Sequence, residues 1–281
     1  MKQSTKKFLK IVAGILLVAV ISVAVYFYLG FFGNPVSKIL CRNSAEKYVS
    51  ENYPDCYVNS RGYNFKDGRY FANIQKDGSV DTNFFVYTDW LGNIKYDSYE
   101  SYVTSGHNTA NRMMMEYRDL LEDAVRQEDV DYTIDIFYGD ILNDYYGKEF
   151  HNLNAYNAAY MPQEEIIIDK QYDYSDIGYK YGYVCLYAED ADVSVSRAAE
   201  ILLDLKSRLD SQNLGFYCID FVLELPRKTD GSPNDDKTRI NIDYFLWYDI
   251  YAEGLEERVQ SAHDDLTAYY AKLDAEKFDT K

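Results

Sequence analysis

The sequence lacks the short motifs that mark several common enzymatic chemistries. It contains no glycine-rich phosphate loop, no Gly-x-Ser-x-Gly elbow, no His-Glu-x-x-His pair and no Cys-x-x-Cys pair. Nucleotide hydrolysis on a phosphate loop, serine-hydrolase chemistry, zinc-protease chemistry and thiol redox chemistry therefore have no support. The three histidines, His107, His151 and His263, show no clustering of the kind that supplies a zinc site. We assign no catalytic residue and no cofactor from the sequence.

Residues typical of linkers are scarce as well. The chain has five Pro and fifteen Gly and no Ser/Thr/Pro-rich stalk, which argues against a wall-spanning rod or a disordered tether. In contrast, its 30 Tyr and 14 Phe fall mostly in strand-like alternation, which is typical of folded β structure. A chain of 281 residues is expected to form one or two domains.

One long uncharged run lies near the start of the chain. Residues 11–32 carry no charge, and about 20 apolar residues suffice for a helix to cross the hydrocarbon core. Ser22-Val23-Ala24 has the form of a cleavage site, but the apolar run continues past it, unlike that of a removable signal peptide. Lipoprotein processing at Cys41 is disfavoured because bulky Leu40 precedes it. We therefore predict a single transmembrane signal-anchor helix over residues 11–32, in preference to a cleaved signal or a buried core helix.

The charges beside this run predict its orientation. The basic flank, residues 1–10, carries Lys2, Lys6, Lys7 and Lys10, and short basic flanks stay in the cytoplasm. We therefore expect a protein of the cell membrane with a cytoplasmic N-terminus and an extracytoplasmic C-terminal domain, whose membrane contact is residues 11–32.

Acidic residues dominate the remainder of the chain. The net charge is −17, and the first 33 residues contribute four lysines and no acid, so the rest carries −21. Nucleic acid is excluded as a partner, and anionic lipid is disfavoured, because both are bound through Lys and Arg. Much of this charge serves solubility. The partner that we expect is an extracytoplasmic protein.

Residues 33–104 are predicted to form a small α+β module. Asn34-Pro35 is typical of a helix start, and the helix is expected to reach about Asn52. The apolar residues expected on its buried side are Val36, Ile39, Leu40, Ala45, Tyr48 and Val49. Asp67-Gly68, Asp77-Gly78 and Leu91-Gly92-Asn93 then separate short aromatic-rich runs, as in successive hairpins. The strands expected in this antiparallel meander are 57–66, 69–76, 82–89 and 94–101.

Residues 105–281 are predicted to form a larger α+β module. Helical spacing over 113–125 is followed by strand spacing over 132–138, and a strand pair is expected at 164–170 and 179–187. A second helix over 198–209 leads into strands at 217–225 and 240–248, and a last helix begins near Leu255. The order helix, strand, strand thus occurs twice. The fold class expected for the whole chain is α+β with one N-terminal transmembrane helix.

Several segments of the chain resemble a known family. The residues Gly33-Asn34-Pro35 at the end of the apolar run, AEKYVSENYP (45–54), DGRYFANI (67–74) and SYESYVTSGHNTANRMMMEY (98–117) are similar to the YfjL-like family of membrane-anchored proteins from Gram-positive bacteria. The likeness is firmest over residues 30–120. It implies the anchored topology and a division near residue 105, and it supplies no functional residues.

Carboxylate side chains are the main candidates for catalysis or metal binding in this sequence. Pairs such as Asp129/Asp131, Asp190/Asp192 and Asp235/Asp236 would serve a glycosidase only if they flanked a sugar. The segments DKQYDYSD (169–176) and EDADVS (189–194) alternate acids near strand ends without the Gly and Glu of the ordered calcium loop. The candidate metal ligands are therefore Asp169, Asp173, Asp176, Asp190 and Asp192.

The four cysteines lie in a compartment that permits disulfides if the orientation above holds. Cys41 is a candidate partner of Cys56, and Cys185 a candidate partner of Cys218. Four cysteines allow three pairings, and four buried free thiols are an equal alternative.

Two classes of function remain open. The favoured hypothesis is a non-enzymatic, membrane-anchored binding or regulatory module of the bacterial cell envelope, which predicts a cleft or exposed sheet face without converging acids and bases. The alternative is an envelope hydrolase that uses paired carboxylates with separated pKa values in one groove. A calcium-binding or carbohydrate-binding surface domain is a further alternative, the latter with Trp90 and Trp247 as stacking residues.

Overall fold

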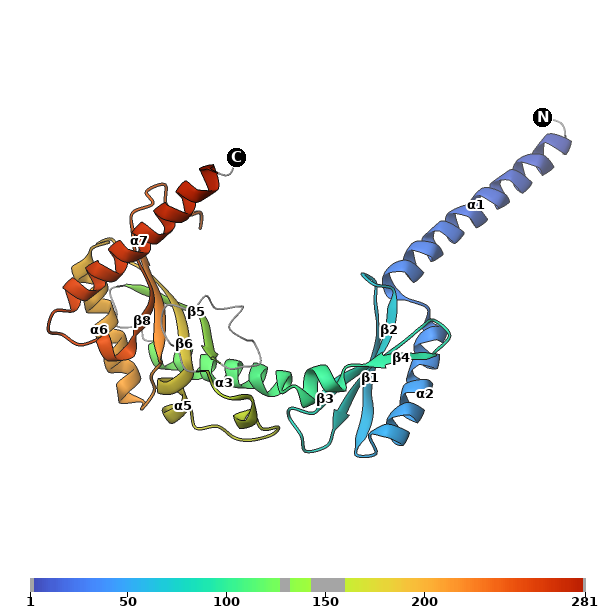
Figure 1. Ribbon diagram of the computed structural model, residues 1–281. Helices are drawn as coiled ribbons and strands as arrows, with labels where there is room; N and C mark the ends of the chain where they lie inside the picture. Colours follow the sequence, from blue (N-terminus) through green and yellow to red (C-terminus); the bar gives the residue numbers. More distant parts are fainter. Residues whose placement is uncertain (1–2, 127–131, 143–159, 280–281) are drawn as a thin grey trace. The chain divides into compact units, whose positions relative to one another are not determined.

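The computed structural model describes residues 3–126, 132–142 and 160–279. The chain divides into two compact units, Met1–Asn108 and Thr109–Lys281, and each is described by itself. Unit 1 contains a long apolar helix and a helix packed on a four-stranded sheet. Unit 2 contains a second four-stranded sheet with helices (Figure 1). The predicted α+β fold class is confirmed.

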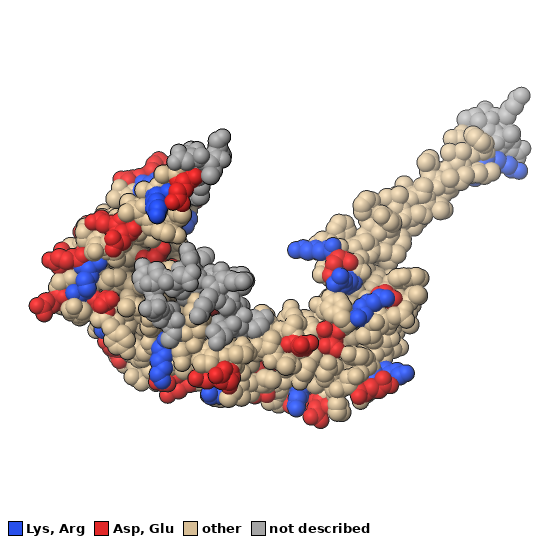
Figure 2. All heavy atoms as spheres, viewed as in Figure 1, with Lys and Arg blue, Asp and Glu red and all other residues tan. Residues whose placement is uncertain are grey.

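Helix α1 (Gln3–Phe32) contains the predicted membrane segment (Figure 1). Among the described residues, one helical stretch is long and apolar enough to cross a membrane; its best window has a mean hydropathy of 2.7 and no buried residues. Figure 2 shows this helix almost free of charged side chains along its length. A signal sequence has the same features, so α1 is a candidate membrane span.

Two residues, Gly33 and Asn34, separate α1 from α2 (Pro35–Asn52). Gly33 adopts a left-handed conformation with φ of 73°, which ends α1. The Asn34 side chain caps α2 by accepting a hydrogen bond from the Val36 N–H at 2.9 Å, and Pro35 occupies the first turn. The predicted start and end of this helix are confirmed.

The buried face of α2 agrees with the predicted one only in part. Ala45 and Val49 are buried as predicted, but Ser37 and Cys41 complete the buried face, whereas Val36, Ile39 and Leu40 are exposed. Small side chains spaced four residues apart let the helix approach the sheet closely, and this spacing outweighed hydrophobicity in selecting the buried face.

Sheet A consists of β1 (Cys56–Asn64), β2 (Arg69–Lys76), β3 (Asn83–Thr88) and β4 (Ile94–Asp97) in that order, all antiparallel. The predicted meander is therefore confirmed. The last strand is shorter than predicted, because Asp97 accepts a hydrogen bond from the Tyr99 N–H and the chain turns into a π-helix, η1 (Glu100–Thr104). One face of the sheet packs against α2 around Ile74, Phe84 and Val86.

Unit 2 is built on sheet B, which has the order β5-β6-β7-β8. Its strands are β5 (Thr133–Ile141), β6 (Gly182–Glu189), β7 (Cys218–Glu224) and β8 (Arg239–Leu246). β6 and β7 are parallel and are joined by α6 (Val195–Ser211), while the other neighbours are antiparallel. One face of the sheet shares a large apolar core with α3 (His107–Val125), α6 and α7 (Leu255–Asp279).

One predicted strand of unit 2 is wrong, and another begins three residues later than predicted, at Gly182. Residues 164–170 form a short 3-10 helix, η3 (Gln163–Glu165), and a turn in which Asp169 has a φ of 62°. Residues 179–181 belong to α5 (Tyr174–Tyr181), which Asp173 caps. The isoleucine-rich run at residues 164–170 therefore does not join sheet B, since both edges of β6 are occupied by β5 and β7.

Candidate functional site

The outer face of sheet A, opposite α2, carries a row of aromatic rings. We call Phe71, Phe85, Tyr87 and Tyr96 the ring face. The Tyr87 and Tyr96 rings are stacked with centroids 4.6 Å apart, and Phe85 lies 6.1 Å from Tyr87 and 5.5 Å from Phe71. Phe71, Phe85 and Tyr87 are partly exposed and Tyr96 is 44% exposed, so each ring reaches solvent.

Strand alternation explains why these rings face outward. Tyr70 and Phe84 point into the core, so their neighbours Phe71 and Phe85 must point to the opposite side. Gly62 lies opposite Phe71 on β1, and a Cβ atom at Gly62 would come within 2.3 Å of the Phe71 ring. The glycine therefore lets the ring lie across β1.

Uncharged polar side chains border the ring face. The Tyr57 hydroxyl is 3.4 Å from Gln75 Oε1, and the Asn59 amide is 3.4 Å from Asn73 Oδ1. At the other end Arg69 donates a hydrogen bond to the Tyr96 hydroxyl at 2.7 Å, and its guanidinium lies 5.5 Å from that ring's centroid. This arrangement of rings and amides suits an uncharged polar ligand that stacks on aromatic surfaces.

The face of sheet B opposite its large core carries a buried carboxyl group that is hydrogen-bonded to neighbouring strands. The Tyr183 hydroxyl of β6 donates a hydrogen bond of 2.5 Å to Asp220 Oδ2 on β7, and the Tyr244 N–H of β8 donates one of 2.7 Å to Asp220 Oδ1. The Tyr183 and Tyr244 rings are stacked with centroids 5.7 Å apart. Tyr244 has a φ of 53°, an uncommon value for a bulky residue, at an irregularity in the β7–β8 pairing.

The surroundings of Asp220 shift the pKa values of several groups. Burial, together with the nearby carboxylate of Asp243, raises the pKa of Asp220 to about 6. Burial also raises the pKa of Asp243. Burial and these two carboxylates raise the pKa of the Cys185 thiol to about 11. The site therefore offers a carboxyl group that holds its proton close to neutral pH beside a second carboxyl group.

The predicted metal ligands have other roles in the structure. Asp173 caps α5 by accepting a hydrogen bond from the Ser175 N–H at 3.0 Å, and Asp176 pairs with Lys180 at 2.7 Å. Asp190 pairs with Arg197 at 2.8 Å, and the Asp192 N–H donates to Asp190. Asp169 lies in the turn after η3. Within the residues that the structure describes, no three His, Cys, Asp or Glu side chains are grouped to hold a metal ion.

All four cysteines are free thiols in the structure, which has neither candidate pairing. Cys41 lies near Thr88, at the last residue of β3, whereas Cys56 pairs with Lys76 at the opposite end of sheet A. On sheet B, Cys218 is opposite Tyr183 and Cys185 is opposite Asp220, so the two thiols are diagonal neighbours.

The remaining predicted residues are dispersed. His107 packs against Tyr102 with ring centroids 5.0 Å apart, and His263 accepts a hydrogen bond from the Asn241 N–H at 3.2 Å. His151 and the pair Asp129/Asp131 lie outside the described residues. Trp247 is buried against Phe216 and is no stacking residue, while Trp90 is exposed after β3.

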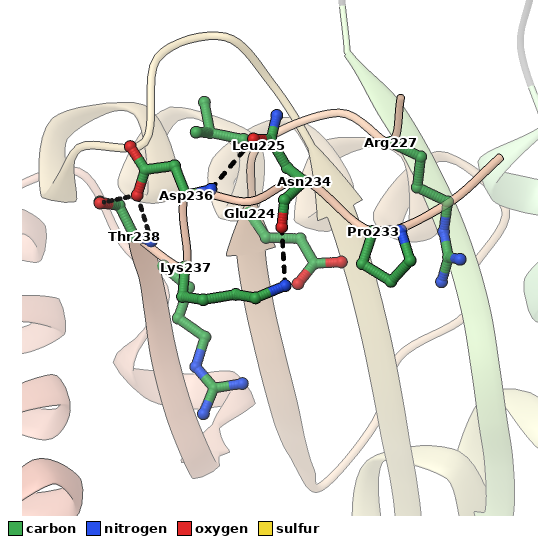
Figure 3. A pocket seen from close by; sticks show the side chains of 9 residues that line it. Glu224, Leu225, Arg227, Pro233, Asn234, Asp236, Lys237 and Thr238 are labelled. Carbon is green, nitrogen blue, oxygen red and sulfur yellow. Dashed lines mark hydrogen bonds between the residues drawn. The ribbon is translucent and has the colours of Figure 1, made fainter. Parts of the chain in front are cut away.

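A shallow pocket lies on the loop between β7 and β8 (Figure 3). Its polar groups bind one another: Lys237 Nζ donates to the Asn234 carbonyl at 2.6 Å, and Thr238 Oγ1 donates to Asp236 Oδ1 at 2.7 Å. Asp235 pairs with Lys228 at 2.6 Å. The pair Asp235/Asp236 is therefore used in shaping the loop.

Sequence reasoning missed both the ring face and the Asp220 site, although each had a signal. The signal for the ring face was the presence of consecutive aromatic residues, Tyr70-Phe71 and Phe84-Phe85, which must face opposite sides of a strand. The signal for the second site was one acid in each of two apolar strands, Asp220 and Asp243, because a buried acid requires a specific environment.

Comparisons with known proteins support a family assignment. The family model described as "YfjL-like, N-terminal domain" matches residues 8–98, and that described as "YfjL-like C-terminal domain" matches residues 116–260. A search of curated proteins found no match. The crystal structure of a DUF5037 family protein from Ruminococcus gnavus is similar over 65% of this chain and 73% of that chain, with 16% identity and a TM-score of 0.21. A TM-score this low carries no structural argument.

Proposed function

The chain belongs to the YfjL-like family, and from that premise we propose that it is a membrane-anchored, extracytoplasmic binding module of the bacterial cell envelope. The proposed anchor is α1, and the proposed ligand surface is the ring face of sheet A. The domain limits that we propose are a cytoplasmic flank over 1–10, the anchor over 11–32, a small module over 33–104 and a larger one over 105–281.

The anchor is supported by the length and flanks of α1. The uncharged run of residues 11–32 would extend about 33 Å as a helix, close to the thickness of the hydrocarbon core. Four lysines precede it, against Lys38 and Arg42 in the first two turns of α2. This asymmetry favours a cytoplasmic N-terminus.

The ring face is the observation that carries the binding proposal. It is a partly exposed sheet face with four neighbouring rings, bordered by amides, and Arg69 contacts one of its rings. In a chain of net charge −17, a face built from rings and amides favours an uncharged ligand. We propose a glycan, since sugar rings stack on aromatic rings while their hydroxyl groups bind amides.

A binding measurement on the full chain in lipid nanodiscs tests this proposal. Neutral chitooligosaccharides and cello-oligosaccharides are the probes, and Tyr96→Ala is the variant. Loss of one stacking ring should weaken binding roughly five- to tenfold. Tyr269→Ala is the matched control, because Tyr269 is 46% exposed on α7 in the other unit. Equal weakening in both variants, or no binding of any neutral glycan by the unaltered chain, would reject the ring face as a glycan site.

A second experiment tests the wider proposal of an envelope module. The intact chain is crosslinked on living cells and recovered, with a chain lacking residues 34–281 as the control. Recovery of an envelope component that depends on residues 34–281 is the expected result. Recovery of cytoplasmic proteins alone would contradict the proposed orientation.

A hydrolase is the second candidate function, and the Asp220 site is the observation that favours it. Asp220 keeps its proton up to a pH of about 6, as a general acid requires, and Asp243 is a neighbouring carboxyl group. Two carboxyl groups of this kind are the usual catalytic pair of glycosidases.

A measurement of glycan hydrolysis distinguishes the hydrolase from a protein that only binds the glycan. If the chain hydrolyses a bound glycan, Asp220→Asn and Asp243→Asn should each abolish hydrolysis while binding persists, and Asp235→Asn should leave hydrolysis unchanged. Hydrolysis that survives both of the first two substitutions would exclude the carboxyl pair.

A further inference from the structure

One end of sheet A adjoins the end of the proposed membrane anchor. β1 and β2 are joined by a turn at residues 65–68, and β3 and β4 by a turn at residues 89–93. Because all four strands are antiparallel, both turns lie at the same end of the sheet. We call these two turns the hairpin tips. The turn between β2 and β3, at residues 77–82, lies at the opposite end, which we call the distal end.

Three contacts connect the hairpin-tip end to the end of α1 and to the two residues that follow it. The rings of Phe31 and Phe65 lie 5.9 Å apart, and the Asn34 N–H donates a hydrogen bond of 2.8 Å to the Tyr70 hydroxyl. Gly33 packs so closely on Tyr63 that a Cβ atom would come within 2.5 Å of its ring. Figure 1 shows the β1–β2 hairpin beside the end of α1.

These contacts place the first hairpin tip at the level where α1 leaves the bilayer. The uncharged run of α1 ends at Phe32, so Phe31 belongs to the headgroup region of a spanning helix. Phe65, in contact with Phe31, must then lie at the same depth.

The hairpin tips expose the residue types that membrane interfaces select. Phe65 is 55% exposed, and Trp90 and Leu91 of the second tip are 65% and 53% exposed. The second tip also meets α2, where a Cβ atom at Gly92 would come within 3.0 Å of Leu40. Exposed aromatic residues of this kind sit favourably at the headgroup level, where one side is apolar and the other wet.

The charges of unit 1 are segregated between its two ends. At the hairpin-tip end the basic residues are Lys38, Lys66, Arg69 and Lys95, and the acidic ones are Asp67 and Asp89. At the distal end the basic residues are Lys47 and Lys76, and the acidic ones are Glu51, Asp55, Asp77 and Asp81. Figure 2 shows basic side chains, with acidic ones beside them, where α1 meets the module. The hairpin-tip end therefore complements an anionic surface, although the whole chain is acidic.

We propose that the two hairpin tips form a second membrane-contact surface, which seats unit 1 on an anionic phospholipid headgroup layer through Phe65, Trp90 and the neighbouring lysines. The occupant is a lipid surface for two reasons. The tips lie at the depth where α1 is proposed to leave the membrane, and their excess of basic side chains complements anionic headgroups. This inference rests on the proposed membrane anchor, and it makes α1 and the tips one continuous membrane interface.

Fluorescence quenching tests the proposal on the full chain. The chain has two tryptophans, and Trp247 is buried in unit 2, so the difference between the unaltered chain and Trp90→Phe reports Trp90. The vesicles contain phosphatidylglycerol and phosphatidylcholine brominated near the headgroup end of its acyl chains. Bromine should remove much of the Trp90 emission, and the Phe65→Trp emission as well when that substitution is made in the Trp90→Phe chain.

Two further variants of the Trp90→Phe chain serve as depth references. Tyr57→Trp lies near the distal end, roughly 23 Å along β1 from the first tip, and should keep its emission. Leu17→Trp lies in the middle of α1 and should be quenched by acyl chains brominated near their ends. Quenching of Leu17→Trp without quenching at either tip would overturn the seated module and leave the anchor standing. Absence of quenching at Leu17→Trp would overturn both.

A charge exchange tests the role of the headgroup charge. Lys66→Glu with Lys95→Glu should reduce quenching of Trp90, whereas Lys47→Glu with Lys76→Glu at the distal end should not. Vesicles of phosphatidylcholine alone should quench Trp90 less. Equal quenching with and without the anionic lipid, or equal effects of the two lysine pairs, would overturn the anionic headgroup layer as the occupant.

Discussion

At the residue scale, Asp220 is the clearest conflict between side chain and surroundings. Its carboxyl group is largely buried, and the groups that bind it are the Tyr183 hydroxyl and the Tyr244 N–H. Neither partner carries a positive charge, so burial dominates and the pKa rises. Tyr244 adopts its left-handed conformation at this same point of β8. A strained backbone beside an acid of raised pKa is more typical of functional sites than of plain structural strands.

The raised pKa predicts a pH dependence of stability. The folded chain holds a proton on Asp220 up to a pH of about 6, whereas the unfolded chain loses it near 3.8. The stabilising contribution is complete below the unfolded value and is lost as pH rises through the folded value, by about 3 kcal/mol. Asp220→Asn should remove most of this loss. Denaturant titrations of both chains between about pH 4 and pH 7 measure it.

The control for this prediction is Asp235→Asn, since Asp235 is highly exposed on the β7–β8 loop. That substitution should leave the pH-dependent loss that arises from Asp220 in place. If the slope of the Asp220→Asn chain also equals that of the unaltered chain, Asp220 titrates alike in the folded and unfolded chains.

Gly33 gives a second prediction at this scale. Alanine there would need a φ of 73° and would bring its Cβ atom within 2.5 Å of Tyr63. We expect Gly33→Ala to lower the unfolding free energy of unit 1 by roughly 1–3 kcal/mol. Gly30→Ala is the control, because its Cβ atom would meet nothing within 4 Å. A Gly33→Ala chain as stable as the Gly30→Ala chain would show that the connection between α1 and α2 accommodates a Cβ atom without loss of stability.

At the element scale, the sequence predicted local features better than the faces of elements. The cap Asn34-Pro35 and the turns Asp67-Gly68 and Asp77-Gly78 have direct physical causes in one or two residues, and the structure has α2 and the hairpins there. The buried face of α2 depends on how closely the helix approaches the sheet, which no residue of the helix reveals alone. For the same reason the apolar run at 164–170 could not be distinguished from a strand, because the strands that occupy both edges of β6 in its place, β5 and β7, are not its neighbours in sequence.

The candidate sites show the same limit. The outward direction of Phe71 and Phe85 follows from strand alternation once their inward neighbours are known. The meeting of Asp220 with Tyr183 requires the parallel pairing of β6 and β7 across α6, a non-local fact. The acid pairs close in sequence have separate structural roles where the structure describes them, whereas Asp220 and Asp243, whose charges influence each other, come from different strands.

The close approach of α2 to sheet A can be tested directly. Ala45 is fully buried on this face, so Ala45→Leu should overpack the interface and lower the unfolding free energy by about 1–3 kcal/mol. Lys47→Leu, on the exposed side of the same helix, adds the same side chain without that cost. Thermal or denaturant unfolding of unit 1 measures both. Similar stability of the two variants would mean that α2 packs loosely on the sheet.

At the scale of the whole molecule, net charge is a poor guide to where the chain can bind. The value of −17 predicts repulsion from anionic lipid, yet one end of unit 1 has more basic than acidic side chains. Net charge governs solubility and long-range approach, whereas binding depends on the charges of the surface that makes contact. The membrane-contact surface and the acidic surface are therefore compatible within one chain.

The division into two units predicts how the molecule unfolds. The core of unit 1 and the large core of unit 2 share no residue, so each should unfold cooperatively by itself. Gly33→Ala should therefore lower the midpoint of one transition, and Asp220→Asn at neutral pH should raise that of the other. Calorimetry of the two single variants and their combination measures this, with additive shifts expected. A single transition moved by both substitutions would mean that α3, whose first residues belong to unit 1 and the rest to unit 2, joins them into one cooperative structure.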